Sequence, residues 1–190
     1  MPAPLCHAFF ATPIGECAVA CGDSGLAGVW LPETRPGGLR RKLSRHSSGV
    51  REEAPTQEVA AAIDAITRLL SGVHVDLRDV RLDLGGIGEF RRRVYAVARS
   101  IAPGHVLTYG AVARQVGADA SARAVGQALG ANPFPIVVPC HRVVASAGGL
   151  GGFSAPGGVA LKRRLLAIED ARLDGPPDLF DAPTLASARG

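Results

Sequence analysis

The chain has 190 residues, of which 47% are hydrophobic and 20% charged, and this composition excludes an intrinsically disordered protein. No apolar run approaches the ~20 residues that cross a bilayer, and no basic segment followed by an apolar stretch opens the chain, so we expect a protein of the cytoplasm or of the nucleoid within it. Residues 86–172 carry eleven basic and four acidic side chains, so any attraction to nucleic acid belongs there, although basic residues more often form only a solvated surface.

Residues 7–31 have the pattern of short antiparallel strands, with turn sequences at 12–15 (Thr-Pro-Ile-Gly) and 22–25 (Gly-Asp-Ser-Gly) between β-compatible runs. Residues 32–50 are rich in Pro, Gly, Ser and basic side chains, and we interpret them as an exposed, mobile loop.

Thr56 is the expected N-cap of a helix whose apolar residues recur at helical spacing as far as Leu70. The alternation of residues 74–84 favours an edge strand. These elements together predict a small α/β domain that spans residues 1–85.

The four cysteines, Cys6, Cys17, Cys21 and Cys140, are predicted to be free thiols, because a chain of this kind seldom carries a disulfide framework. Cys17 and Cys21 share one strand face, which favours thiols buried in a core. A zinc site would need two more ligands and only Cys6 and His7 are nearby, so no metal site is expected.

Residues 86–172 are predicted to form a second, mostly helical domain, which starts with a helix near Phe90 whose arginines face solvent. Thr108 is the expected N-cap of a short helix at 109–116, and another short helix follows at 122–131. Two short helices joined by a brief turn have the outline of a helix-turn-helix.

The helix at 122–131 consists almost wholly of Ala, Gly, Val and Leu, and Arg123 is its only charged residue. A helix with so smooth a surface can lie in a narrow groove of nucleic acid while its arginine reaches into the base stack. It can equally be a tightly packed core helix with an incidental surface arginine.

The stretch from Asn132 to Val144 predicts a short buried strand at 134–138, followed by a turn that presents Cys140 and His141. A cysteine and a histidine on a rigid turn suggest thiolate chemistry. The alternative is a small core cysteine beside a surface histidine, because a Cys-His pair alone is a weak signal.

Residues 146–158 include six glycines and are expected to form a flexible loop that lines or closes a pocket. A last helix follows from Val159, with Lys162 exposed and Glu169 near its end. Residues 173–190 are expected to be a partly ordered tail.

Together these residues resemble the family of O6-alkylguanine-DNA alkyltransferases, also called methylated-DNA-protein cysteine methyltransferases. The matching motifs are Pro139-Cys140-His141-Arg142-Val143 with Asn132-Pro133 before it, Thr108-Tyr109-Gly110, Ser121 to Gly126, and Lys162, Leu165, Leu166 and Glu169. They cover about residues 86–170. The resemblance implies an α/β (α+β) fold, with a ribonuclease H-like N-terminal domain and a winged-helix-like C-terminal domain that contains the helix-turn-helix.

The resemblance also implies direct DNA repair by a methylated-DNA-[protein]-cysteine S-methyltransferase that acts once and needs no cofactor. Cys140 would take the alkyl group of O6-alkylguanine, or of O4-alkylthymine, as an irreversible thioether. The other implied roles fall to His141 (proton acceptor through a water), Glu169 (orienting His141), Asn132 (supporting the turn and the proton relay) and Tyr109 (donor to the leaving base).

The implied partner is double-stranded DNA, approached from its minor groove by a monomer, with cooperative assembly on DNA left open. The target base must leave the stack, and Arg123 would fill the gap. The other implied DNA contacts are Thr108, Tyr109, Ala122, Ala124 and Gly126, and the implied base-binding residues are Tyr109, Val143, Phe153 and Ser154.

Three departures leave the shape of the pocket and the preferred alkyl group undetermined: Phe153 where many relatives have tyrosine, the insertion Ala155-Pro156, and Tyr95 in place of a common tryptophan. One rival function is a DNA-binding sensor of the same fold, which the presence of Cys140 disfavours because such relatives replace the nucleophile. Another rival is a Cys-His hydrolase, which would need an oxyanion hole and would turn over repeatedly.

Overall fold

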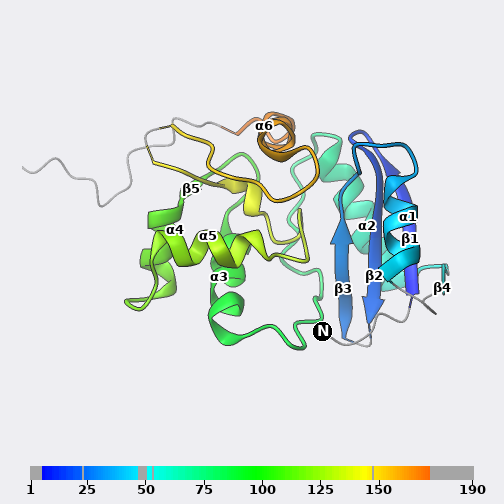
Figure 1. Cartoon of the computed structure of the whole chain (residues 1–190), viewed down its shortest axis with the longest axis horizontal. Helices are drawn as coiled ribbons and strands as arrows, with labels where there is room; N and C mark the ends of the chain where they lie inside the picture. The colour runs from blue at the N-terminus through cyan, green and yellow to red at the C-terminus, as the bar shows by residue number, and fades with distance from the viewer. Residues whose placement is uncertain (1–5, 23, 47–50, 53, 147, 172–190) are drawn as a thin grey trace, which may run out of the picture.

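The computed structural model describes residues 6–22, 24–46, 51–52, 54–146 and 148–171. The fold is α/β, as predicted, with a small sheet at one end of the molecule and a group of short helices at the other (Figure 1). In the described part of the chain, no helix is both long enough and apolar enough to cross a membrane.

The N-terminal sheet contains three antiparallel strands that follow one another along the chain, β1 (Cys6–Thr12), β2 (Gly15–Gly22) and β3 (Gly25–Trp30). A two-residue strand, β4 (Arg51–Glu52), pairs with β1 in parallel and gives the order β3-β2-β1-β4. The predicted meander is therefore confirmed, while Asp23 of its second turn lies outside the described residues.

Helices lie on both faces of this sheet (Figure 1). Helix α2 (Gln57–Leu70) begins at the predicted N-cap, where the Thr56 hydroxyl accepts a hydrogen bond from the Val59 N–H at 3.4 Å. Its apolar side chains belong to a hydrophobic core that continues from the sheet into the C-terminal helices. The two predicted domains thus share packing across the expected boundary at residue 85.

The expectation of a mobile loop at 32–50 is wrong for its central part, which forms helix α1 (Gly38–His46). Leu39 and Leu43, one helical turn apart, are buried against the second face of the sheet. The basic and polar composition of the segment concealed this pair of leucines. Two leucines are enough to hold the helix in place, because the sheet supplies the apolar surface against which they pack. Residues 47–50 lie outside the described part.

The edge strand expected at 74–84 is also absent, because an isolated bridge between Leu26 and Leu82 is the only ladder contact recorded for that segment. The carbonyl groups of Leu77, Arg78 and Val80 instead accept hydrogen bonds of 2.6 to 3.0 Å from one guanidinium nitrogen of Arg99. Since these carbonyls converge on one donor, the segment curls and cannot form a regular ladder.

Two other parts of the chain occupy the outer edge of β3. The Leu26 N–H donates to the Arg81 carbonyl at 2.9 Å, and the Val29 N–H donates to the Pro133 carbonyl at 2.9 Å. Pro133 belongs to the turn that carries Cys140. The sheet is therefore bonded directly to that turn.

Cys6 and Cys21 form a disulfide, which corrects the prediction that all four cysteines are free. The two residues lie directly opposite each other in the β1–β2 ladder, with Cα atoms 5.3 Å apart, within the range that a disulfide requires. Cys17 and Cys140 are free thiols, as predicted, and both are buried, which was predicted for Cys17 alone. Among the described residues, no group of three or more His, Cys, Asp or Glu side chains is placed to hold a metal ion.

The C-terminal part contains α3 (Glu89–Ser100), β5 (Leu107–Thr108), α4 (Tyr109–Val116), α5 (Ala122–Gly130), the 3-10 turn η1 (Cys140–Arg142), β6 (Val143–Val144) and α6 (Gly158–Ile168). The predicted helices are confirmed. Thr108 caps α4 by accepting from the Ala111 N–H, and Ser121 caps α5 by accepting from the Ala124 N–H. Helices α4 and α5 pack against each other and against α3, as a helix-turn-helix requires.

Candidate active site

The strand predicted at 134–138 is wrong, because only an isolated bridge joins Pro135 to Val138 in this segment. Ile136 has φ +74°, a left-handed conformation that a β-branched residue adopts only when its surroundings impose it. The two prolines on either side of Phe134 already disfavour a paired strand. A compact turn therefore leads into Cys140.

Asn132 holds this turn from inside. Its side-chain oxygen accepts a hydrogen bond from the Phe134 N–H at 2.9 Å, and its side-chain nitrogen donates to the Val138 carbonyl at 2.9 Å. The Cys140 N–H also donates to the Val138 carbonyl, at 2.8 Å. These bonds fix the backbone on both sides of Pro139 and so fix the direction of the Cys140 side chain.

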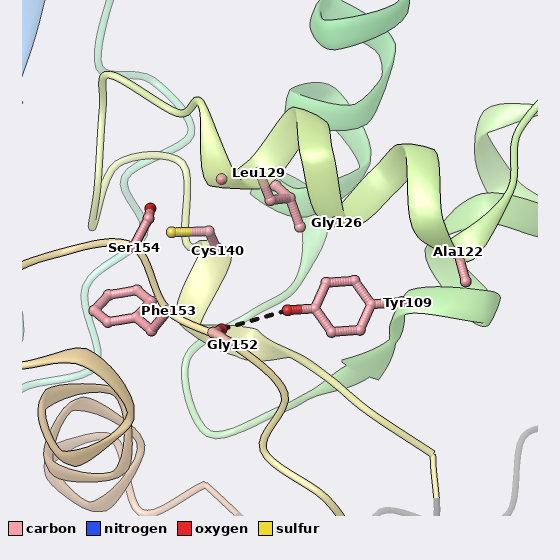
Figure 2. A pocket seen from close by; sticks show the side chains of 9 residues that line it. Tyr109, Ala122, Gly126, Leu129, Cys140, Gly152, Phe153 and Ser154 are labelled. Carbon is pink, nitrogen blue, oxygen red and sulfur yellow. Dashed lines mark hydrogen bonds between the residues drawn. The ribbon is translucent and has the colours of Figure 1, made fainter.

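The Cys140 side chain lies at a cavity of about 490 Å³ between α5 and the glycine-rich loop (Figure 2). The cavity is lined by Tyr109, Ala122, Gly126, Leu129, Gly130, Cys140, Gly152, Phe153 and Ser154. Six of these nine residues are among the predicted site residues. Figure 2 shows the sulfur directed toward the side of the cavity where Phe153 and Ser154 lie.

His141, Arg142 and Glu169 form a buried network behind Cys140. His141 Nε2 lies 2.9 Å from Glu169 Oε1, and Arg142 contributes two further hydrogen bonds to the Glu169 carboxylate, at 2.8 and 2.9 Å. The other ring nitrogen of His141, Nδ1, is buried and has no hydrogen-bond partner among the described residues. Because Nδ1 makes no hydrogen bond within the described residues, it is the ring nitrogen at which His141 can accept a proton.

Burial governs the acid–base properties of this network. It raises the pKa of the Cys140 thiol, against the opposing effects of the Asn132 side chain and the Lys162 charge. It also lowers the pKa of His141, against the hydrogen bond and charge of Glu169. At rest the pair is therefore a neutral thiol and a neutral imidazole, which leaves the imidazole able to accept a proton.

Burial acts on Glu169 in the direction of a raised pKa, but the hydrogen bonds and charges of His141 and Arg142 together outweigh it and lower the pKa to about 2. Glu169 is thus an anion at neutral pH. Arg142, which sequence reasoning quoted in the motif without a role, is needed here as a buried partner of that anion. It also donates to the Ile101 carbonyl at 2.5 Å.

Tyr109 lies across the cavity from Cys140, where its hydroxyl donates a long hydrogen bond of 3.5 Å to the Gly152 carbonyl (Figure 2). Burial and the charge of the Cys140 thiolate raise the pKa of the phenol. The hydroxyl therefore stays protonated and can exchange its weak bond to Gly152 for a bond to a bound molecule.

The outer side of α5 presents Ala122 and Arg123 to solvent, close to the cavity that Ala122 helps to line. Gly126 faces Tyr109, since a Cβ at Gly126 would lie 3.8 Å from the Tyr109 ring. Small residues thus leave open the passage between the helix surface and Cys140.

Some predicted site residues do not reach the cavity. Val143 is fully buried behind the turn, and the Thr108 hydroxyl is used as a helix cap. Ala124 is half-buried on α5 and is not part of the lining.

Lys162 was predicted to be exposed and is fully buried instead. Its Nζ donates to the Val143 carbonyl at 2.6 Å and to the Gly152 carbonyl at 3.3 Å. The sequence contains a signal for this placement, because positions 162, 165, 166 and 169 lie on one face of a helix and the other three are buried. The adjacent Arg163 and Arg164 concealed it.

Comparison with known families gives a match over residues 89–171 to the family described as 6-O-methylguanine DNA methyltransferase, DNA binding domain. The methylated-DNA–protein-cysteine methyltransferase of Methanothermobacter thermautotrophicus is 40% identical over 86% of this chain and 84% of its own length. A protein of Thermus thermophilus named DNA base-flipping protein is 38% identical, over 77% of this chain and 95% of its own.

Among solved structures, the crystal structure of Mycobacterium tuberculosis OGT in complex with DNA superposes with a TM-score of 0.68 at 32% identity. The superposition covers 86% of this chain and 92% of that one. The similarity therefore extends through the N-terminal sheet as well as the helices around Cys140.

Proposed function

This chain belongs to the family of methylated-DNA–protein-cysteine methyltransferases, and from that premise we propose that it repairs O6-alkylguanine, and O4-alkylthymine, in double-stranded DNA by a single transfer to Cys140. The observation that carries the proposal is the placement of a buried thiol at a cavity of about 490 Å³, backed by the His141–Glu169 pair.

In the proposed reaction, His141 Nδ1 accepts the thiol proton through a water, and Glu169 stabilises the imidazolium that forms. The thiolate of Cys140 attacks the alkyl carbon in line with the bond to O6. A new S–C bond forms as the C–O6 bond breaks, and its electron pair stays on the base. The thioether has no hydrolytic route back to the thiol, so each molecule acts once.

Tyr109 donates its hydroxyl proton toward the base as negative charge develops there, which lowers the barrier to departure. Phe153 forms an apolar wall for the base, and Ser154 supplies a polar group at its edge. Their common position around one cavity supports these roles.

The target atom is not accessible inside a duplex, so the nucleotide must rotate out of the stack. We propose that α5 enters the minor groove as part of a protein monomer. Arg123 then occupies the space left by the base while Ala122, Ala124 and Gly126 allow the backbone to come close. Thr108 contributes by fixing the start of α4 beside this surface.

The experiment is intact-protein mass spectrometry after incubation with a duplex that contains one O6-methylguanine. We expect every active molecule to gain one methyl group in place of a proton, and peptide mapping to place it on Cys140. Cys17 is the internal control, because burial raises the pKa of its thiol to about 11 and keeps it unreactive.

Two other outcomes have definite meanings. Tight binding to the methylated duplex without a gain in mass would assign the chain to recognition of alkylated DNA without repair. Repeated turnover on a thioester substrate would assign it to hydrolysis.

A further inference from the structure

Glu169, the C-cap of α6, has partners at both of its ends. Its carboxylate binds His141 and Arg142. Its main-chain carbonyl oxygen lies 3.0 Å from Nε2 of His74, which stands 95 positions away in the sequence. The residue that orients the imidazole beside Cys140 is therefore held by a second histidine, which comes from the N-terminal part of the chain.

The hydrogen bond between His74 and Glu169 has a defined direction. A carbonyl oxygen can only accept a hydrogen bond, so Nε2 of His74 carries the proton and donates it. The last carbonyl groups of a helix have no partner within the helix and need donors from elsewhere. His74 supplies such a donor at the residue whose carboxylate faces His141.

The backbone directly after Glu169 is tightly constrained. The next two N–H groups turn back onto the Ala167 and Leu166 carbonyls, at 3.2 and 2.9 Å, and so end the helix in a compact turn. Asp170 has φ +50°, a left-handed conformation that residues other than glycine adopt mainly when their surroundings impose it. The bond from His74 is one such constraint, because it holds the carbonyl of the peptide that joins Glu169 to Asp170.

Gly104 leaves the space in which this contact forms. Its φ is +81°, and a Cβ at this position would lie 3.2 Å from the Glu169 carbonyl oxygen and 3.3 Å from the His74 ring. Gly104 lies after α3 and His74 lies after α2, so three separate parts of the chain meet at the end of α6. The peptide after Glu169 is thus held by packing as well as by a hydrogen bond.

The backbone position of Glu169 matters because its carboxylate meets two partners at once. Arg142 binds both carboxylate oxygens, at 2.8 and 2.9 Å, whereas His141 makes a single contact of 2.9 Å. Arg142 is also anchored to the Ile101 carbonyl. A guanidinium bound in this way holds a carboxylate more firmly than one imidazole does. A displacement of Glu169 would therefore be taken up at its contact with His141.

We propose that His74 is a positioning residue for the transfer to Cys140: by donating from Nε2 to the Glu169 carbonyl, it keeps the Glu169 carboxylate against His141. This inference rests on the proposed function and adds to its proton-transfer network a residue from the N-terminal part of the chain.

The matched control is His105, which follows Gly104 directly. His74 and His105 are both exposed, and each has a ring nitrogen close to a carbonyl oxygen. The Nδ1 atom of His105 lies 3.2 Å from the carbonyl of Pro103 in its own turn. Removal of either side chain therefore takes away an imidazole near the same turn, but only His74 contacts Glu169.

The first test follows the ¹⁵N signals of the histidine side chains by NMR in the absence of DNA. In the unaltered protein the neutral rings of His74 and His141 should both carry their proton on Nε2. His74→Ala should shift the His141 signals toward a mixture of the two tautomers, and His105→Ala should leave them unchanged. A proton on Nδ1 of His74, or His141 signals that do not respond to His74→Ala, would overturn the inference.

The second test measures single-turnover transfer from a duplex that contains O6-methylguanine. His74→Ala should lower the maximal rate about tenfold, because a small misplacement of an orienting group slows the chemical step. The half-saturating concentration of duplex should not change. His74→Gln, whose amide nitrogen can donate to the same carbonyl, should recover most of the rate. An equal loss in His105→Ala, or weaker binding of the duplex in place of a lower rate, would contradict the proposed role.

A combined variant separates an effect through Glu169 from a general effect on structure. In a Glu169→Gln background, His74→Ala should cause no further loss of rate, because the group that it positions is already impaired. A further loss of about tenfold in that background would show that His74 serves the structure alone.

Circular dichroism establishes whether each variant is folded. If His74→Ala or Glu169→Gln is not, the tautomer of His74 in the unaltered protein decides. The NMR measurement needs no methylated DNA, so it stands apart from methyl transfer. A failure to gain a methyl group would contradict the proposed function and leave the effect of His74 on His141 measurable.

Discussion

Cys140 is the residue at which chemistry and binding can be separated. Cys140→Ser should abolish methyl transfer, because a hydroxyl is a far weaker nucleophile than a thiolate at neutral pH. Affinity for methylated duplex should stay close to that of the unaltered protein, since the helix surface is untouched. Intact mass and fluorescence anisotropy measure the two properties, and transfer by the serine variant would refute the assignment of the nucleophile.

Glu169 supports both the structure and the proposed proton transfer. Glu169→Gln should cost about 3 to 5 kcal/mol of unfolding free energy, because it leaves the buried guanidinium of Arg142 without its anion. The rate of transfer should also fall, since the imidazolium of His141 loses its stabilising charge. Urea denaturation and single-turnover kinetics measure these effects. Asp170→Asn, at the exposed neighbouring position, is the control and should change neither.

Residues in local motifs were predictable from the sequence, and residues whose role depends on distant partners were not. Cys140 and Tyr109 come from motifs, Phe153 and Ser154 come from the glycine-rich loop that was expected to line a pocket, and the structure brings all four to one cavity. Lys162 was misplaced because its partners, the carbonyl groups of Val143 and Gly152, carry no side-chain signature. Backbone acceptors become visible only when the chain is folded.

The role of helix α5 in DNA binding can be tested separately from the transfer reaction at Cys140. Arg123→Ala should slow repair of a methylated duplex far more than reaction with free O6-benzylguanine, because only the duplex must lose a base from its stack. Arg163→Ala, on the exposed side of α6, is the matched control. Equal losses on both substrates would argue against a role of Arg123 in base flipping.

At the scale of elements, helices with caps and a full apolar face were predicted well. Thr56 and Thr108 each accept the expected hydrogen bond at a helix start, and Ser121 caps α5 in the same way although it was not predicted to do so. Helix α1 was not predicted because Leu39 and Leu43 are the two residues that give it an apolar face. The strand predicted at 74–84 does not form because carbonyl groups of this segment accept hydrogen bonds from Arg99. Both errors arise from contacts with elements far away in the sequence.

The folded protein should lose stability in acid over the pH range in which Glu169 becomes protonated. Its pKa is lowered from the ordinary value of 4.5 to about 2, so the stabilisation is complete above pH 4.5 and is lost as pH falls toward 2. The loss should amount to about 3 kcal/mol. Thermal unfolding measured at successive pH values tests this, and Glu169→Gln should flatten the dependence in the same window.

The disulfide between Cys6 and Cys21 should stabilise the whole fold, because the sheet shares its core with the helices. The bond closes a loop with a sequence separation of 15, which corresponds to about 3 kcal/mol in the chain-entropy account. Addition of dithiothreitol should therefore lower the melting temperature of the unaltered protein. The double variant Cys6→Ala, Cys21→Ala should show no response to the reductant.

The bond from the Val29 N–H to the Pro133 carbonyl has a consequence for solubility. Strand β3 ends the sheet, and an uncovered edge of this kind is a template on which strands of other molecules can add. The turn beside the nucleophile covers the Val29 end of that edge, so any event that displaces the turn uncovers this part of the edge for self-association. Damage to the reactive turn should therefore be seen as precipitation as well as lost repair.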